Sequence, residues 1–319
     1  MNKDNVRILV IGAGVNGSIC AVGLYNAGID VTILARGKRY EEIRDGGIVI
    51  DDPFKNTRSI TKVPVINHLD PEDSYDYILV VVRKNQVPDL LPLLARNKSA
   101  NVVFMVNNPS GPNEWIQALG KERVMEGFVF GAGKRDGSVI RAISESASSI
   151  AGRLWPSPFG EVDGTITPRL KRLVNILRQA GLPAGISQDA TDYLATHAAQ
   201  VAVMARLIMQ RGYDRVSLAH YTNDDLGLLV DAMREVLDVL PAAGIRVTPG
   251  NIAILKIIPR FLLVACFRAL LPSKFMEVGA LYHISQAPDE MRQLGMELMV
   301  LVEKSGLPAP ALRKLFAPD

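Results

Sequence analysis

Cysteine is nearly absent from this chain, which has Cys20 and Cys266 among its 319 residues. Two cysteines are too few for a disulfide framework, and their scarcity is typical of a reducing compartment. The first apolar run begins at Val6 and continues directly into a glycine motif, so it does not resemble a signal peptide. We therefore expect a cytoplasmic protein.

A charge imbalance is also lacking. Thirty-six Lys and Arg against 33 Asp and Glu leave a net charge of +3, and no basic run is interleaved with aromatics, which argues against a nucleic-acid partner.

The segment that comes nearest to a membrane span, Ile252 to Leu271, contains Lys256, Arg260 and Arg268. Because charges at mid-span are costly in a bilayer, we predict a buried helix there and no membrane partner. No histidines have metal-ligand spacing, so no metal site is expected.

The most informative stretch present runs from Val6 to Ser18. A continuous apolar run leads into Gly12, Gly14 and Gly17 in the pattern Gly-x-Gly-x-x-Gly, and a helical pattern follows. A buried strand, a glycine turn and a helix in this order are the context of the dinucleotide-binding fingerprint. The alternative is a glycine turn of the same shape that binds no ligand.

The second predicted strand, Asp30 to Arg36, ends at the position that distinguishes the two nicotinamide dinucleotides. An acid there bonds the ribose hydroxyls of NAD, whereas an arginine accommodates the 2′-phosphate of NADP. This chain has Ala35-Arg36-Gly37-Lys38-Arg39 and no acid before Glu41. Three cations beside a glycine favour NADP, although a solvated basic loop would look the same.

Strand and helix patterns alternate through the first half of the chain. Further strands are expected at 77–82, 101–106 and 123–130, a hairpin-like excursion after Ile48, a loop at 131–133, and helices at 41–47, 87–94 and 168–180. This alternation predicts an α/β fold with a doubly wound, Rossmann-type parallel sheet.

After Pro183 the pattern becomes helical. Helices are expected at 189–210, 224–243, 252–271, 289–305 and 310–316. We therefore predict a dinucleotide-binding domain over residues 1–183 and an all-helical domain over 184–319, with 181–187 as the linker. The apolar helices after Ile252 could bury the interface of a homodimer, or they could be interior.

Polar residues follow two of the predicted strands. Arg83-Lys84-Asn85-Gln86 comes after the strand at 77–82, and Asn107-Asn108-Pro109 follows the strand at 101–106. In an open parallel sheet, ligands bind beyond the carboxyl ends of the strands. Asn107 and Asn108 could hold a substrate or the nicotinamide, or they could be turn formers before proline.

Taken together, these motifs resemble the ketopantoate reductase (2-dehydropantoate 2-reductase) family. The resemblance rests on the glycine turn, Val31 to Gly37, Ile43 to Gly47, Val82-Arg83-x-x-Gln86, Asn107-Asn108, Gly120 to Val124 with Gly127, and Phe159 to Gly164. It implies a Rossmann domain followed by a helical domain, with NADPH as cofactor and a small 2-oxo acid as the hydride acceptor.

The resemblance also assigns residues to the cofactor. It implies that Arg36 holds the 2′-phosphate and that Arg83 stands where the family has a cofactor-contacting lysine. Asn108 matches the asparagine of the family's Gln-Asn-Gly, with Pro109 in place of the glycine. The full set of expected cofactor-binding residues is Gly12, Gly14, Val15, Asn16, Gly17, Arg36, Arg83, Gln86 and Asn107, and Asn108 is a catalytic candidate.

The helical domain departs from the family pattern, in which a catalytic lysine lies on the domain's first helix. No lysine occurs between Lys171 and Lys256, and the count from Asp189 brings His197 to the lysine position. A one-residue slip aligns Thr196 and Gln200 instead. Because a carbonyl reductase needs a proton donor, His197 is the candidate acid, the alternative being a histidine buried by packing.

The family's late Thr-Glu-Ile-Asp segment is matched to Glu277, which has neither the threonine nor the aspartate beside it. Glu277 could orient a substrate or be a solvated helix residue, and Lys274 and His283 are reserve candidates. Ala265 stands at the position of a substrate-contacting serine. An altered acid and a lost serine suggest that the substrate is not ketopantoate.

The sequence thus predicts an NADPH-dependent oxidoreductase that transfers hydride to a small carbonyl or imine compound. One alternative is an opine-type dehydrogenase, which shares the architecture and uses a histidine for proton transfer. Another is a binding protein that senses NADP(H) without catalysis, as the loss of the lysine would allow.

Overall fold

The computed structural model describes residues 6–144 and 146–317, which form two compact units. The first unit contains the chain up to Val106 and Pro112–Ala190, and the second contains Asn107–Gly111 and the chain from Thr191 onward. Among the described residues, no helix is long and apolar enough to cross a membrane.

The first unit is built on an eight-stranded sheet with the order β12-β11-β8-β7-β6-β1-β2-β5. Every neighbouring pair is parallel except β8 and β11. The strands are β1 (Arg7–Ile11), β2 (Asp30–Leu34), β5 (Val65–Ile66), β6 (Tyr77–Val80), β7 (Val102–Phe104), β8 (Val124–Gly127), β11 (Ser157–Glu161) and β12 (Ala184–Ile186). The predicted α/β class with a Rossmann-type sheet is confirmed.

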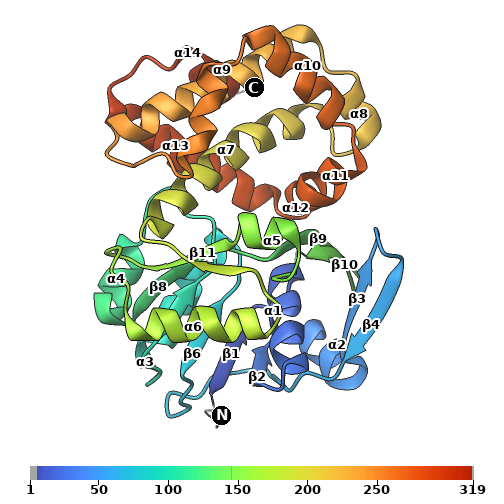
Figure 1. The fold of residues 1–319 in the computed structure, drawn as a ribbon, viewed down its shortest axis with the longest axis vertical. Coiled ribbons are helices and arrows are strands. Elements are labelled where there is room, and N and C mark those ends of the chain that lie inside the picture. The colour runs from blue at the N-terminus through green and yellow to red at the C-terminus, as the bar shows by residue number, and fades with distance from the viewer. Residues whose placement is uncertain (1–5, 145, 318–319) are drawn as a thin grey trace. The chain divides into compact units, whose positions relative to one another are not determined.

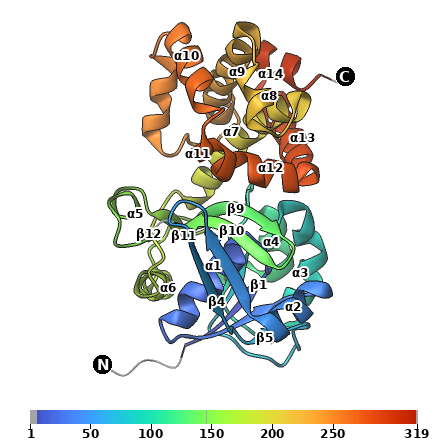
Figure 2. The same cartoon turned by 90° about the vertical axis from the view of Figure 1, so that its right-hand side faces the viewer.

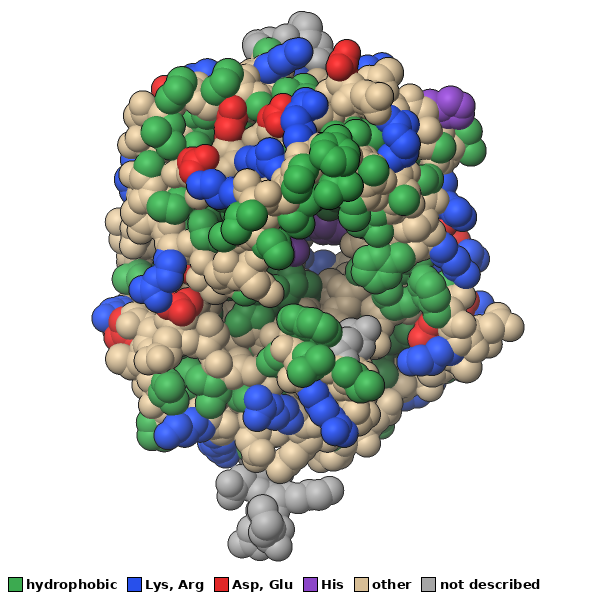
Figure 3. Space-filling view, turned by 45° about the horizontal axis from the view of Figure 1, so that its top comes forward, with side chains coloured by type: hydrophobic (Ala, Val, Ile, Leu, Met, Phe, Trp, Pro, Cys, Tyr) green, Lys and Arg blue, Asp and Glu red, His purple; other side chains and the backbone are tan. Residues whose placement is uncertain are grey.

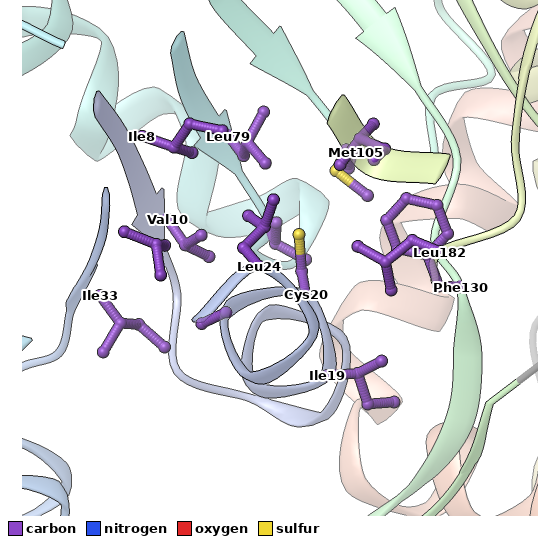
Figure 4. Close-up of a cluster of buried hydrophobic side chains, with 14 of the residues drawn as sticks. Ile8, Val10, Ile19, Cys20, Leu24, Ile33, Leu79, Met105, Phe130 and Leu182 are labelled. Carbon is purple, nitrogen blue, oxygen red and sulfur yellow. The ribbon is translucent and has the colours of Figure 1, made fainter. Parts of the chain in front are cut away.

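Helices cover both faces of this sheet because its strands are apolar on both sides. The helices of the unit are α1 (Val15–Asn26), α2 (Lys38–Gly46), α3 (Val87–Arg96), α4 (Asn113–Leu119), α5 (Ile150–Leu154) and α6 (Pro168–Gln179). Alternate β1 residues Ile8 and Val10 pack with α1 and α6, whereas Leu9 and Ile11 pack with α3 and α4. Figures 1 and 2 show the helices on the two faces, and Figure 4 shows Cys20 of α1 within the first of these clusters.

A second, four-stranded sheet has the order β4-β3-β10-β9. Its strands are β3 (Ile48–Asp52), β4 (Thr57–Thr61), β9 (Gly131–Asp136) and β10 (Val139–Ser144), so the excursion predicted after Ile48 is confirmed. The loop predicted at 131–133 is wrong, because these residues begin β9. A Cβ at Gly133 would lie 2.2 Å from the Arg141 carbonyl oxygen, so this glycine permits close strand pairing rather than a turn.

The helical unit contains α7 (Ala190–Arg211, whose first residue belongs to the first unit), α8 (Arg215–Ala219), α9 (Asn223–Ala242), α10 (Arg260–Leu270), α11 (Lys274–Met276), α12 (Tyr282–Gln286), α13 (Pro288–Ser305) and α14 (Pro310–Leu315). Two irregular helical segments, η3 (Gly250–Lys256, a 3₁₀ helix) and η4 (Glu277–Leu281, a π-helix), complete it. The helical character predicted after Pro183 is confirmed.

Two predicted boundaries differ from the structure. The predicted linker at 181–187 contains β12, which pairs with β11, so the first unit continues to Ala190 rather than ending at Pro183. The buried helix predicted over 252–271 is wrong in two respects. The helix is interrupted before Pro259, which cannot donate a backbone hydrogen bond, and much of its surface is exposed.

Candidate functional site

The turn after β1 is the first part of the candidate site, and its glycines are required by close packing. Gly12 has a φ of +110°, and a Cβ there would lie 2.2 Å from the Val81 carbonyl oxygen. A Cβ at Gly17 would lie 1.8 Å from the carbonyl oxygen of Gly12. Only glycine fits these two positions, so the start of α1 lies directly against the end of β1.

Gly14 has a different environment. Apart from Gly14 itself and the backbone next to it, no heavy atom of the described chain lies within 4 Å of a Cβ built at this position, and no described side chain caps the first turn of α1. The amides that open α1, at Val15 and Asn16, are therefore available to an anion, which the helix dipole would favour. The Asn16 side-chain oxygen accepts a bond of 3.0 Å from the Gly131 amide, which joins α1 to β9.

Arg39 fixes the glycine turn from the side of α2. Its Nε donates to the Ala13 carbonyl oxygen at 3.1 Å, and its Nη1 donates to the Ser138 carbonyl oxygen at 2.9 Å and lies 3.2 Å from Glu42. Burial lowers the pKa of this guanidinium, with the Glu42 hydrogen bond opposing the shift. The Arg39 side chain thus bonds to groups of its own chain. Of the three cations expected to bind the 2′-phosphate, Arg36 and Lys38 are exposed after the end of β2.

We expect Arg39→Ala to lower the free energy of unfolding by about 2 kcal/mol, since a charged donor loses its buried carbonyl partners. The turn would also hold a dinucleotide less tightly. Thermal unfolding and NADPH titration would measure the two effects. Arg44→Ala on the same helix, where Arg44 is exposed and pairs with Asp45, is the control and should change neither. An Arg39 variant as stable as the control would contradict this prediction.

The residues beyond β6 form a 3₁₀ turn over Lys84–Gln86. The Gln86 side-chain oxygen accepts from the Arg83 amide at 3.2 Å, which gives Gln86 a local capping contact. The sequence prediction missed Lys84, which is buried with its Nζ 5.2 Å from the centre of the Trp115 ring. No sequence signal distinguished Lys84 from Arg83, because a basic residue beyond a strand is ordinarily exposed.

Asn107 and Asn108 lie in the segment that groups with the helical unit. Asn108 is fully buried and Asn107 is partly buried. In the same segment, the Ser110 hydroxyl donates to Glu297 of α13 at 2.5 Å. A surface turn does not require a buried amide, so Asn108 stays a candidate for a specific role.

His197 lies partly buried on α7, and its ring is parallel to that of Tyr193 with centroids 6.2 Å apart. Burial, followed by the charge of nearby His283, lowers the pKa of His197 to about 4. The imidazole is therefore neutral at neutral pH, whereas the acid role predicted for His197 requires a protonated side chain. The alternative candidates have internal bonds: Thr196 accepts from the Thr248 amide at 3.1 Å, and Gln200 donates to the Met233 carbonyl oxygen at 3.2 Å.

The carboxylate beside these histidines is Glu290. It is 2% exposed in the first turn of α13, and one of its oxygens lies 3.4 Å from His283 Nε2. The sequence prediction missed Glu290, although Asp289-Glu290-Met291-Arg292 has the polar-Glu-apolar-polar order of the family segment that was assigned to Glu277. The structure thus brings together His197, His283 and Glu290, from three helices.

Among the described residues, no hydrogen bond or ion pair joins Glu277 to this group. Glu277 is partly buried in the π-helical segment η4, where its backbone amide donates to the Ser273 carbonyl oxygen at 3.0 Å, but its side chain forms no hydrogen bond or ion pair with any described residue. π-Helical turns are frequent at functional sites, so Glu277 stays a candidate for orienting the substrate. Ala265 is exposed on α10, whereas His283 and Glu290 belong to α12 and α13, so Ala265 gives no information about a pocket near the histidines.

Two other motif segments have structural roles. Glu161 at the end of β11 accepts from Arg169 Nε at 2.8 Å, and Arg123 donates to the carbonyl oxygens of Ser99 and Leu94. The Glu161 bond joins β11 to α6, which follows it, and the Arg123 bonds hold the residue before β8 against the end of α3 and the loop after it. The motif residues therefore support the sheet and need no ligand to explain them.

Comparison with known proteins gives a family match for the first part of the chain. Residues 8–150 match the family described as ketopantoate reductase PanE/ApbA. A 2-dehydropantoate 2-reductase of Archaeoglobus fulgidus is 29% identical over 184 residues, which are 57% of this chain and 56% of that protein. The match thus spans little more than half the length of this relative.

Solved structures share the fold along nearly the whole chain. A 2-dehydropantoate 2-reductase from Methylococcus capsulatus has a TM-score of 0.73 at 18% identity, covering 98% of this chain and 95% of its own. A D-mandelate dehydrogenase solved with NADH and anilino(oxo)acetate also has a TM-score of 0.73, at 15% identity, covering 97% of this chain and 96% of its own. At these identities the similarity establishes the fold, including the helical unit that the family match does not reach.

Proposed function

Because residues 8–150 match the ketopantoate reductase family, we propose that this chain is an NADPH-dependent oxidoreductase that reduces the carbonyl group of a small 2-oxo acid or a related carbonyl or imine compound. The observation that carries the proposal is the glycine turn, which is closed by packing at Gly12 and Gly17 and open at Gly14. An anion-binding turn at the centre of a Rossmann-type sheet is the feature that dinucleotide binding requires.

The residues of the first unit fit a nicotinamide dinucleotide. The amides that open α1 would bind the pyrophosphate, and the space at Gly14 permits the backbone to approach it. Exposed Arg36 and Lys38 at the end of β2 would bind the 2′-phosphate of NADPH. When bound, the cofactor supplies the hydride. Arg83 and Asn107 are proposed as further cofactor contacts, while the side chain of Gln86 caps the local turn.

The helical unit would supply the proton that the substrate oxygen takes up. With a pKa near 4, a protonated His197 is a strong donor, but at neutral pH very little of it is protonated. A second proton source is therefore needed beside it. His283 is suited to this role because its side chain is 42% exposed, which allows exchange with water, and because the Glu290 carboxylate lies against it. Asn108 and Glu277 would orient the substrate.

The role of Arg36 gives a direct test of cofactor choice. We expect Arg36→Ala to raise the Kd for NADPH by roughly 10- to 100-fold, because a charge-assisted contact to phosphate is lost. The Kd for NADH should remain unchanged. Fluorescence titration of both reduced cofactors would measure this, with Arg96→Ala, at an exposed arginine of α3, as control. Equal loss for both cofactors would contradict a contact to the 2′-phosphate.

The reaction itself is tested by supplying NADPH with a panel of 2-oxo acids, each with and without an amino acid, and following cofactor oxidation. Turnover with an oxo acid alone supports the proposal. Turnover only when an amino acid is also present would indicate an opine-type dehydrogenase. Tight NADPH binding without any oxidation would indicate a binding protein that senses the cofactor.

A further inference from the structure

Helix α10 is apolar on two opposite faces. Leu263, Val264 and Leu271, which directly follows the helix, are buried in the core of the helical unit. The outward face carries Phe261, Leu262, Ala265, Cys266, Ala269 and Leu270, all exposed. Their four-residue spacing places them along one side of the helix. An ordinary surface helix has polar residues opposite its buried side, so a second apolar side indicates a covered surface.

The segment before α10 extends this surface. Ile254 and Ile257 are exposed there, Ile257 to 82%, while Phe261 at the start of the helix is 70% exposed. We call Ile254, Ile257 and the six outward residues of α10 the α10 patch. Figure 3 shows hydrophobic side chains gathered over part of the surface of the helical unit.

The size of the α10 patch matches what a stable dimer buries. A fully exposed aromatic side chain presents about 150–250 Å² and an aliphatic one somewhat less, so the large residues of the patch together present roughly 600 Å². Each partner in a standard interface contributes about 800 Å², of which about 65% is apolar in homodimers. The patch supplies that apolar share, and it is at the upper limit for a monomer, about 300–600 Å².

The charges around the patch favour a second copy over a charged partner. Arg260 is bonded to Asp231 of α9 at 2.9 Å, and Lys256 pairs with Asp238 of the same helix. Arg268 donates to the Tyr221 carbonyl oxygen at 2.9 Å and to the Asn223 side chain at 2.8 Å. In a two-fold pair, each group near the axis faces the same group of the other copy. Unpaired cations of the two copies would therefore repel each other. Here each of the three cations is held by its own chain.

We propose that the protein is a homodimer in which the α10 patch of one copy packs against the α10 patch of the other about a two-fold axis. Cys266 lies near the middle of α10, so the two copies of this residue lie close to the axis. The proposal is independent of the proposed function, because it involves none of the residues assigned to cofactor or catalysis.

The test is the mass of the full-length protein in solution, measured by light scattering after size exclusion and by analytical ultracentrifugation. We expect twice the chain mass of 34.8 kDa for the natural protein and the single chain mass for Phe261→Asp and Ile257→Asp. Both side chains are largely exposed, so these variants should keep their thermal unfolding temperature apart from any loss due to dissociation. Val300→Asp, at an exposed position of α13, is the matched control and should remain dimeric.

A second readout uses the natural cysteines. Cys266 is exposed, whereas Cys20 is buried and its pKa is raised by that burial to about 12, so a short bismaleimide should react at Cys266. We expect a covalent dimer from the natural protein and none from Cys266→Ser or Phe261→Asp. A natural protein that is monomeric, a Phe261→Asp variant that stays dimeric, or a dimer that does not cross-link would overturn the proposal.

Discussion

Replacing His197 by alanine is expected to lower kcat by about 10²- to 10⁴-fold, the usual contribution of a positioned acid–base group, because His197 would pass a proton from His283 to the substrate oxygen. The Kd for NADPH should be unchanged, because His197 belongs to the helical unit and the glycine turn to the other. Stopped-flow oxidation of NADPH with the best substrate of the panel would give kcat, and titration would give the Kd.

His220→Ala is the matched control, since His220 is exposed at the end of α8 and its ring contacts the Val216 carbonyl oxygen. His283→Ala should also lower kcat, because the proposed proton source beside His197 is removed. The titratable groups around His197 are Tyr193, His283 and, behind His283, Glu290. If His197→Ala turned over like the His220 variant, the proposed proton transfer would be refuted.

The second large effect is expected at the glycine turn, where two neighbouring glycines should behave differently. Gly17→Ala should lower the unfolding temperature by about 5–10 °C, because a Cβ 1.8 Å from the Gly12 carbonyl oxygen forces a backbone shift that costs about 2–3 kcal/mol. NADPH binding should be lost with it, since the shift moves the amides that bind the pyrophosphate.

Gly14→Ala provides the comparison. A Cβ at Gly14 meets no described atom within 4 Å, so the unfolding temperature should stay within about 2 °C of that of the natural protein. Its methyl group would nevertheless occupy the space through which a pyrophosphate approaches, and NADPH affinity should fall at least tenfold. Unchanged affinity in Gly14→Ala would show that the turn serves packing alone.

Much of the fold could be predicted from local patterns. The strand, glycine turn and helix at Val6–Ser18 were recognised because buried parallel strands are continuous apolar runs. The glycines of β9 misled the prediction, because close strand pairing and a loop both favour glycine. β12 was missed because three residues, Ala184 to Ile186, form a strand only by pairing with β11.

The candidate site was harder to predict, since it depends on contacts between distant segments. In the sequence, Arg39 is one of three similar cations near the end of β2. Only its bonds to the Ala13 and Ser138 carbonyl oxygens show that it stabilises the glycine turn rather than being free to bind a phosphate. Glu290 shares the polar-Glu-apolar-polar order of the family segment with other stretches of the chain, and only its position 3.4 Å from His283 distinguishes it from them. For the apolar helices after Ile252, an interior position and a dimer interface remain equally open on sequence alone, because apolar composition does not reveal which side of a helix is covered.

The loop Asn107–Gly111 leaves the end of β7, groups with the helical unit and returns to the first unit at Pro112. The polypeptide therefore passes from one unit to the other three times, and the helical unit is not contiguous along the chain. A protease that cut once near Ala190 would leave the helical fragment without this loop and its Ser110–Glu297 bond. The two halves should therefore resist separation after nicking, and neither is expected to be recovered intact as a separate recombinant fragment.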